Sequence, residues 1–187
     1  MTATYKFGYL DETGAELRYQ HKNIWAQEKT SGADRLVIAP SFGHVDLLSK
    51  LSGVMEEPYF LLYVLQVPRS EVPPGRYQAP EPISRAKLTS FLRQFGDFLE
   101  GDGRHHFWIG STDKSSLLVY DRHEVVYAYG PLDAFKAILI ENGLQETTDV
   151  LLPDPHVHRY NQSFDQHAGD LMSFWSWKQF PLQDSDL

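Results

Sequence analysis

Apolar and polar residues alternate along residues 104–129, and this pattern predicts three consecutive strands. In the first run His105, Phe107 and Ile109 share one face, because successive side chains of a strand point to opposite sides. Two more β-favouring runs follow at 117–121 and 125–129, each after a short polar stretch of turn-forming residues. Tandem strands with connections this short can pair antiparallel, whereas parallel neighbours need a crossover of a dozen or more residues. We therefore predict a three-stranded meander over about 104–129.

Apolar positions spaced three and four residues apart predict four helices. These are expected near residues 42–52, 84–100, 131–142 and 163–175. The strongest pattern is that of 84–100, where three phenylalanines lie on one stripe and Ser84 is a candidate N-cap. At the start of the last helix, Ser163 and Gln166 have the spacing of a capping box. The helix at 84–100 is expected to cover the sheet.

Other apolar runs predict further strands. We expect an N-terminal hairpin within 4–19, a short strand at 36–39, a buried core strand at 59–67 and a short strand at 156–160. Residues 21–34 show no sustained hydrophobic periodicity, and their sequence permits a short helical turn near Trp25. The whole pattern predicts a single α+β domain over 1–187, with a mainly antiparallel mixed sheet packed by the four helices.

Two segments are predicted to lack regular structure. Residues 67–82 contain five of the eleven prolines. Because proline removes a backbone donor and fixes φ, we expect this segment to be a long surface loop. Residues 183–187 are expected to form a frayed tail.

The composition limits the class of protein and its partners. The 187 residues are 42% hydrophobic and 13% aromatic, with no cysteine and a formal net charge of −8. The absence of cysteine excludes disulfides, thiolate catalysis and cysteine-ligated zinc. No signal segment and no apolar run of the roughly 20 residues needed to span a bilayer is present, so we expect a cytoplasmic protein without membrane contact. The acidic charge disfavours nucleic acid as a partner and suits a basic protein.

Eight histidines supply the candidate metal ligands. His156 and His158 form an H-x-H pair, which places both rings on one face of a strand. An imidazole and carboxylate site needs about three protein ligands. The third is expected from one of four residues, namely His106, His123, Asp102 and Asp154, and His106 is the one grouped with the pair. H-x-H alone does not specify a site, and histidines at strand edges or between aromatic rings are the alternative. A divalent metal is thus the one cofactor that the sequence leaves open.

General acid and base chemistry is a second possibility, with His106, Asp121 and His123 as candidate catalytic residues. A histidine titrates near neutrality, and a nearby carboxylate such as Asp121 could orient the ring of His123. A solvated turn would have the same Asp-Arg-His sequence. No nucleophile elbow and no phosphate-binding glycine loop is found.

A set of arginine and tyrosine residues could instead contact a partner. Guanidinium groups bind carboxylates and phosphates in a bidentate manner, and tyrosines are common at recognition surfaces. The candidate binding residues are Arg69, Arg76, Tyr77, Arg104, Arg122, Arg159 and Tyr160. Arg104, Arg122 and Arg159 would grip an anion together if they converged, and salt bridges to the abundant acidic residues are the alternative.

Two functions follow from these observations. The first is a non-enzymatic protein-binding module, of the inhibitor or adaptor kind, which uses the tyrosine, arginine and histidine side chains and the 67–82 loop. The alternative is a histidine-dependent, metal-assisted hydrolase whose site lies between the meander and residues 156–160. That alternative requires the histidines of the two segments to share a cavity.

Overall fold

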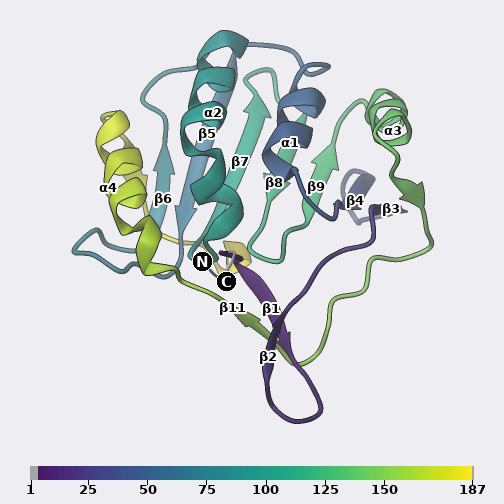
Figure 1. The fold of residues 1–187 in the computed structure, drawn as a ribbon. Coiled ribbons are helices and arrows are strands. Elements are labelled where there is room, and N and C mark those ends of the chain that lie inside the picture. The colour runs from purple at the N-terminus through teal and green to yellow at the C-terminus, as the bar shows by residue number, and fades with distance from the viewer. Residues whose placement is uncertain (1–3, 187) are drawn as a thin grey trace.

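A nine-stranded sheet forms the centre of the protein (Figure 1), whose computed structural model describes residues 4–186. Its strand order is β10-β3-β4-β9-β8-β7-β5-β6-β12, and all neighbours pair antiparallel except β10 and β3. The strands are β3 Ile24–Glu28, β4 Arg35–Ala39, β5 Tyr59–Leu65, β6 Gly75–Gln78, β7 His105–Ser111, β8 Leu117–Tyr120, β9 Val126–Tyr129, β10 Gln145–Glu146 and β12 Lys178–Phe180. The predicted mixed, mainly antiparallel sheet and its meander β7-β8-β9 are confirmed.

A second, three-stranded sheet has the order β11-β1-β2 and projects below the large sheet in Figure 1. Its strands are β1 Phe7–Leu10, β2 Glu16–Arg18 and β11 His156–His158, all antiparallel. The N-terminal hairpin and the strand at 156–158 were expected from the sequence. Their pairing with each other was not, because 145 residues and more lie between them along the chain and no local pattern reports such a contact.

Four α-helices lie on one face of the large sheet (Figure 1), and they confirm the four predicted helices. They are α1 His44–Ser52, α2 Arg85–Gly101, α3 Leu132–Glu141 and α4 Asp165–Phe174. Two short 3-10 helices, η1 Gln162–Phe164 and η2 Asp184–Asp186, complete the described chain. None of the helices within residues 4–186 is long and apolar enough to span a bilayer.

The core lies between the helices and this face of the sheet. Phe91 of α2 is stacked between Phe107 of β7 and Trp175, with ring centroids 5.6 and 5.1 Å away and interplanar angles of 10° and 6°. Each such ring that leaves water contributes on the order of 1.5–3 kcal/mol to folding. The phenylalanine stripe of α2 therefore packs into the core. None of the four α-helices in residues 4–186 covers the opposite face of the sheet (Figure 1).

The first turn of α2 is closed by a side-chain cap. Ser84 Oγ accepts a hydrogen bond of 3.4 Å from the Lys87 backbone N–H. Replacing Ser84 with alanine is expected to lower the free energy of unfolding by about 1 kcal/mol, since one of the free N–H groups loses its acceptor. Urea denaturation measures this. Ser90→Ala, at an exposed position inside the same helix, should leave stability unchanged or slightly higher, and an equal loss there would contradict the capping role.

Residues 21–34 and 67–82 differ from the expectation. The helical turn near Trp25 is wrong, because β3 runs through it and pairs with β4 and β10. The segment 67–82 is not wholly a loop, because β6 pairs with β5 on one side and β12 on the other. Tyr77 of β6 is only 4% exposed. Both strands are fixed by their neighbours across the sheet, which outweigh local propensity.

The chain after Asn161 also differs in part. The predicted capping box is wrong: α4 follows η1 directly and its N-cap, Phe164, makes no side-chain cap hydrogen bond. The strand β12 was not expected. The tail is not frayed at 184–186, where η2 forms and Asp186 is fully buried. Leu187, the last residue of the predicted tail, lies outside the described residues.

Candidate metal centre

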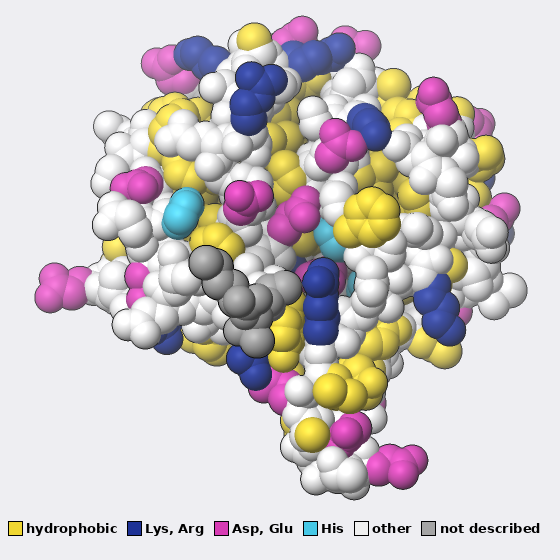
Figure 2. Space-filling model, in the orientation of Figure 1, with side chains coloured by type: hydrophobic (Ala, Val, Ile, Leu, Met, Phe, Trp, Pro, Cys, Tyr) yellow, Lys and Arg dark blue, Asp and Glu magenta, His cyan; other side chains and the backbone are white. Residues whose placement is uncertain are grey.

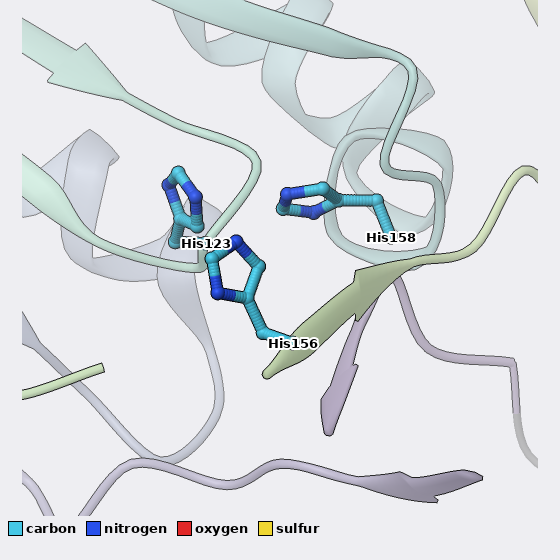
Figure 3. A group of neighbouring side chains, drawn as sticks. All are labelled: His123, His156 and His158. Atoms are coloured by element: carbon cyan, nitrogen blue, oxygen red, sulfur yellow. The ribbon is translucent and has the colours of Figure 1, made fainter. Parts of the chain in front are cut away.

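Three histidines converge where the small sheet meets the β8–β9 turn. His123 lies in that turn, and His156 and His158 lie on β11. One ring nitrogen of each can be chosen so that the three atoms are all within 4.8 Å of one another. The ring centroids are 4.9 to 5.3 Å apart. Figure 3 shows the rings gathered around a common space between the two parts of the chain.

The pairing of β11 with β1 places its two histidines. His158 is opposite Phe7 and His156 is opposite Tyr9, so the alternation of the strand puts both imidazoles on the side that faces the turn. Phe7 is fully buried beneath them, with its ring centroid 5.6 Å from that of His158 and 5.4 Å from that of His123. The apolar ring of Phe7 thus forms the floor of the cluster.

Backbone hydrogen bonds hold β11 against the rest of the domain. The Gly103 N–H donates to the Arg159 carbonyl at 2.8 Å, and the Arg159 N–H donates to the Lys6 carbonyl at 2.9 Å. The Asn161 N–H donates to Asp102 Oδ2 at 2.8 Å. Gly103 has no room for a Cβ atom, which would lie 2.9 Å from the Lys6 carbonyl oxygen. The position of the H-x-H pair is therefore fixed from both β1 and the start of β7.

Asp121 orients the ring of His123. Asp121 Oδ2 lies 2.7 Å from His123 Nδ1, and Oδ1 accepts hydrogen bonds from the backbone N–H groups of His123 and Val125. Burial raises the pKa of the Asp121 carboxyl, but these hydrogen bonds and the positive charge of the neighbouring imidazoles outweigh burial and hold it below its usual value. An ionised Asp121 accepts the proton of Nδ1, so Nε2 of His123 carries the free lone pair.

The other two histidines also present a lone pair to the cluster. His156 Nδ1 lies 3.1 Å from the carbonyl oxygen of Pro153, which can only accept, so this nitrogen carries the proton and Nε2 is free. His158 has no hydrogen-bond partner at either ring nitrogen, although both are buried. Burial, with the nearby positive charges, lowers the pKa of His158 to about 3. A neutral, buried and unpaired imidazole is suited to ligate a metal.

The donor set fits a transition-metal ion. Imidazole nitrogen suits zinc and other first-row transition metals, and the three ring nitrogens lie within 4.8 Å of one another. Of the three rings, His156 is exposed to solvent while the other two are partly buried. This leaves one side of the cluster open for the entry of an ion and for a further, non-protein ligand.

A cleft of about 430 Å³ lies beside the cluster, on the face of the large sheet opposite the four α-helices. His123 belongs to both the cluster and the lining of the cleft. Charged and aromatic side chains form much of its surface, including Arg35, Trp108, Arg122, Tyr127 and Tyr129. Ser185 and Asp186 from the end of the described chain cover part of it.

Comparisons with protein-family models, with curated protein sequences and with solved structures found no match to this chain.

Of the four candidates for the third ligand, the structure brings His123 to the H-x-H pair. His106 lies on β7 and lines the cleft, and its buried Nε2 has no hydrogen-bond partner. Burial lowers its pKa to about 4. Asp102 is bound instead to Arg104. The pair predicted for acid and base chemistry, Asp121 and His123, is in contact, with Asp121 in the orienting position.

The arginine and tyrosine residues selected from the sequence do not gather in one place. Arg104 binds Asp102 and Asp165, Arg159 binds Glu16, and Arg122 lines the cleft. The joint anion grip is therefore not observed. Arg69 forms an ion pair with Asp165 at 3.0 Å, Arg76 lies over Trp108 at 5.0 Å, Tyr77 is buried and donates to the Pro73 carbonyl, and Tyr160 is half-buried.

His21 supports the cluster and was not selected from the sequence. Its Nε2 lies 2.8 Å from the carbonyl oxygen of His123, and its ring is stacked over Phe7 at a centroid distance of 6.1 Å. It thus holds the backbone of the β8–β9 turn in place. An isolated histidine in a stretch without periodicity gives no sequence signal for this role.

Proposed function

We propose that the protein is a metal-dependent hydrolase, with a zinc-type divalent cation bound by His123, His156 and His158. The observation that carries this proposal is the convergence of three imidazoles from two separate sheets, with hydrogen bonds to Asp121 and Pro153 that turn two of the Nε2 lone pairs toward the cluster. A histidine cluster formed only by chance packing would have no reason to share this tautomer pattern.

The number of ligands favours a catalytic over a structural site. Structural zinc is held by four protein ligands, whereas catalytic zinc keeps three and leaves one position to water or substrate. Here three imidazoles are available and the side next to His156 is exposed. A cation held by the three imidazoles would supply Lewis-acid chemistry, because such a site would lower the pKa of a water in its open position toward neutrality.

The cleft supplies a place for the substrate next to His123. Its tyrosine and tryptophan rings suit an apolar or aromatic group, while Arg35, at the opposite strand end, already pairs with Glu28. The reaction supported best is hydrolysis of an ester. The oxygen of water bonds to the acyl or phosphoryl centre, the bond to the leaving oxygen breaks, and one proton of the water passes to that oxygen.

The test begins with untagged protein, since a histidine tag would itself bind metal. We expect about one equivalent of zinc by mass spectrometry of the metal content after dialysis against zinc. Hydrolysis of p-nitrophenyl acetate or p-nitrophenyl phosphate should disappear on treatment with a chelator and return when zinc is added back. Protein that binds no stoichiometric metal would refute the whole proposal, and protein that binds zinc without hydrolysing either ester would refute the hydrolase part.

The protein-binding module remains a prediction from the sequence. All three of its candidate residues in 67–82 have intramolecular partners, since Arg69 pairs with Asp165, Arg76 pairs with Asp186 and Tyr77 donates to the Pro73 carbonyl. Stoichiometric recovery of one protein with the purified chain is the measurement that would support it.

A further inference from the structure

A second pocket, of about 360 Å³, opens on the helix-covered side of the protein. It lies among the N-terminus of α1, the C-terminus of α2, β2 and the β8–β9 turn. Figure 2 shows acidic, basic and histidine side chains meeting near the centre of this face, beside a large hydrophobic side chain. The lining residues that matter here are Arg18, Phe42, His44, Glu100 and Glu124.

His44 presents an unpaired acceptor to this pocket. Its side chain is 2% exposed, and Nε2 has no hydrogen-bond partner. Burial lowers the pKa of His44 to about 3, and a hydrogen bond to the Glu124 backbone acts in the opposite direction. The ring is therefore neutral, and its one proton is used in the bond to the backbone carbonyl. Nε2 is left with a lone pair that needs a donor.

Two carboxyl groups line the same space, that of the half-buried Glu100 and that of the buried Glu124. Glu100 Oε1 accepts a hydrogen bond of 2.6 Å from the Val45 N–H. Glu124 is 3% exposed. Burial raises the pKa of its carboxyl to about 7, and the positive charges of Lys6 and Arg18 act in the opposite direction. The buried ammonium of Lys6 lies near both, but it donates to the carbonyls of Leu99 and Asp121. Lys6 thus supplies charge to the floor of the pocket and no hydrogen bond to Glu124.

Arg18 adds a positively charged hydrogen-bond donor to the acceptors of the pocket. Its exposed guanidinium lines the pocket and forms no ion pair with the acidic side chains of the described chain. Phe42, at the mouth, is 72% exposed, although a ring of this size is costly to leave in water. The pocket therefore combines unpaired acceptors, an unpaired donor and an uncovered apolar surface.

We propose that this pocket binds a small zwitterion, namely a free α-amino acid with an apolar side chain. The ammonium group of the ligand donates to His44 Nε2 and to the Glu124 carboxylate, and the ligand carboxylate accepts from Arg18. The side chain of the ligand packs against Phe42. Charge-assisted hydrogen bonds at the two ends of the ligand thus engage His44, Glu124 and Arg18 of this pocket. The proposal does not depend on a metal at the three histidines.

The probe is L-leucine, with N-acetyl-L-leucine and L-leucinamide as matched compounds that lack the ammonium and the carboxylate respectively. Isothermal titration should show saturable, one-to-one binding of L-leucine, and both matched compounds should bind at least about tenfold more weakly. Arg18→Gln should lower the affinity for L-leucine by a similar factor and leave the affinity for L-leucinamide unchanged.

Both key variants are at exposed positions, so the fold is expected to survive the changes. Phe42→Ala should lower the affinity for L-leucine more than the affinity for free glycine, which has no side chain to pack against Phe42. Arg93→Gln, at an exposed arginine outside the pocket, should change neither affinity. The proposal is overturned if L-leucine shows no saturable binding at millimolar concentration, or if N-acetyl-L-leucine binds as well as L-leucine. It is also overturned if Arg18→Gln has no more effect than Arg93→Gln.

Discussion

Replacing His158 with alanine is expected to lower the affinity of the protein for zinc by more than about 100-fold. Changes to groups that only orient a metal ligand cost roughly 10–100-fold, and the loss of one of three ligands must exceed that. His158 is also the ring whose two buried nitrogens have no other partner. Competition with a chromophoric chelator measures the affinity directly.

His106→Ala is the matched control, because it removes another half-buried histidine with an unpaired Nε2 that lies outside the cluster. Its zinc affinity should equal that of the unchanged protein. The zinc affinity of Asp121→Asn should lie between those of His158→Ala and His106→Ala, at about 10–100-fold below that of the unchanged protein. Asp121 orients His123 and would not itself ligate the ion. If His158→Ala unfolds, the exposed His156 offers the same test. Equal affinities for His156→Ala, His158→Ala and His106→Ala would exclude the cluster as the metal site.

Asp102→Ala is expected to lower the free energy of unfolding by about 3–5 kcal/mol, because it leaves the guanidinium of a buried arginine without its main partner. Asp102 is fully buried and binds Arg104 through both oxygens, at 2.6 and 2.9 Å. It also accepts the Asn161 N–H. Urea denaturation followed by circular dichroism measures the loss.

Asp165→Ala provides the comparison, since Asp165 contacts the same arginine at 2.9 Å from a position whose side chain is 39% exposed. An exposed ion pair contributes about 0–1 kcal/mol. A similar loss of stability in the two variants would show that the buried pair of Asp102 and Arg104 matters no more to stability than the exposed contact of Asp165. Because Asp102 also anchors the segment after β11, Asp102→Ala should weaken zinc binding in addition to stability.

The helices and the meander were predictable because their signals are local. The stripe of Phe91, Phe95 and Phe98 and the short turns of 104–129 each report the structure of their own segment. The strands β3, β6 and β12 were missed for the opposite reason. The strand β12 pairs with β6, which is distant in sequence. Residues 21–34, which contain β3, show no sustained alternation, and β6 has only four residues, set between proline-rich stretches.

The candidate site was predictable as a set of residue types and not as an arrangement. The H-x-H spacing places His156 and His158 on one side of a strand whatever the fold is. The choice of His123 over His106 depends on how the small sheet packs against the β8–β9 turn. That packing depends on Phe7, Gly103 and Asn161, which hold β11 and the segment after it in place. None of the three is a histidine or a carboxylate, so residue type does not mark them as part of a metal site. His106 lies on β7 of the large sheet, and the sequence alone offered it as the third ligand alongside His123.

The three histidines come from two sheets, and this has a consequence for motion. A cation held by His123 on one side and by His156 and His158 on the other would act as a crosslink between them. Opening of β1 and β11 away from the domain would then require release of the ion, so free metal at 100 times its dissociation constant would make such openings about 100-fold rarer. The amide protons shared by β1 and β11 would exchange with solvent at a rate set by the metal concentration, while those between β5 and β7 would exchange independently of it.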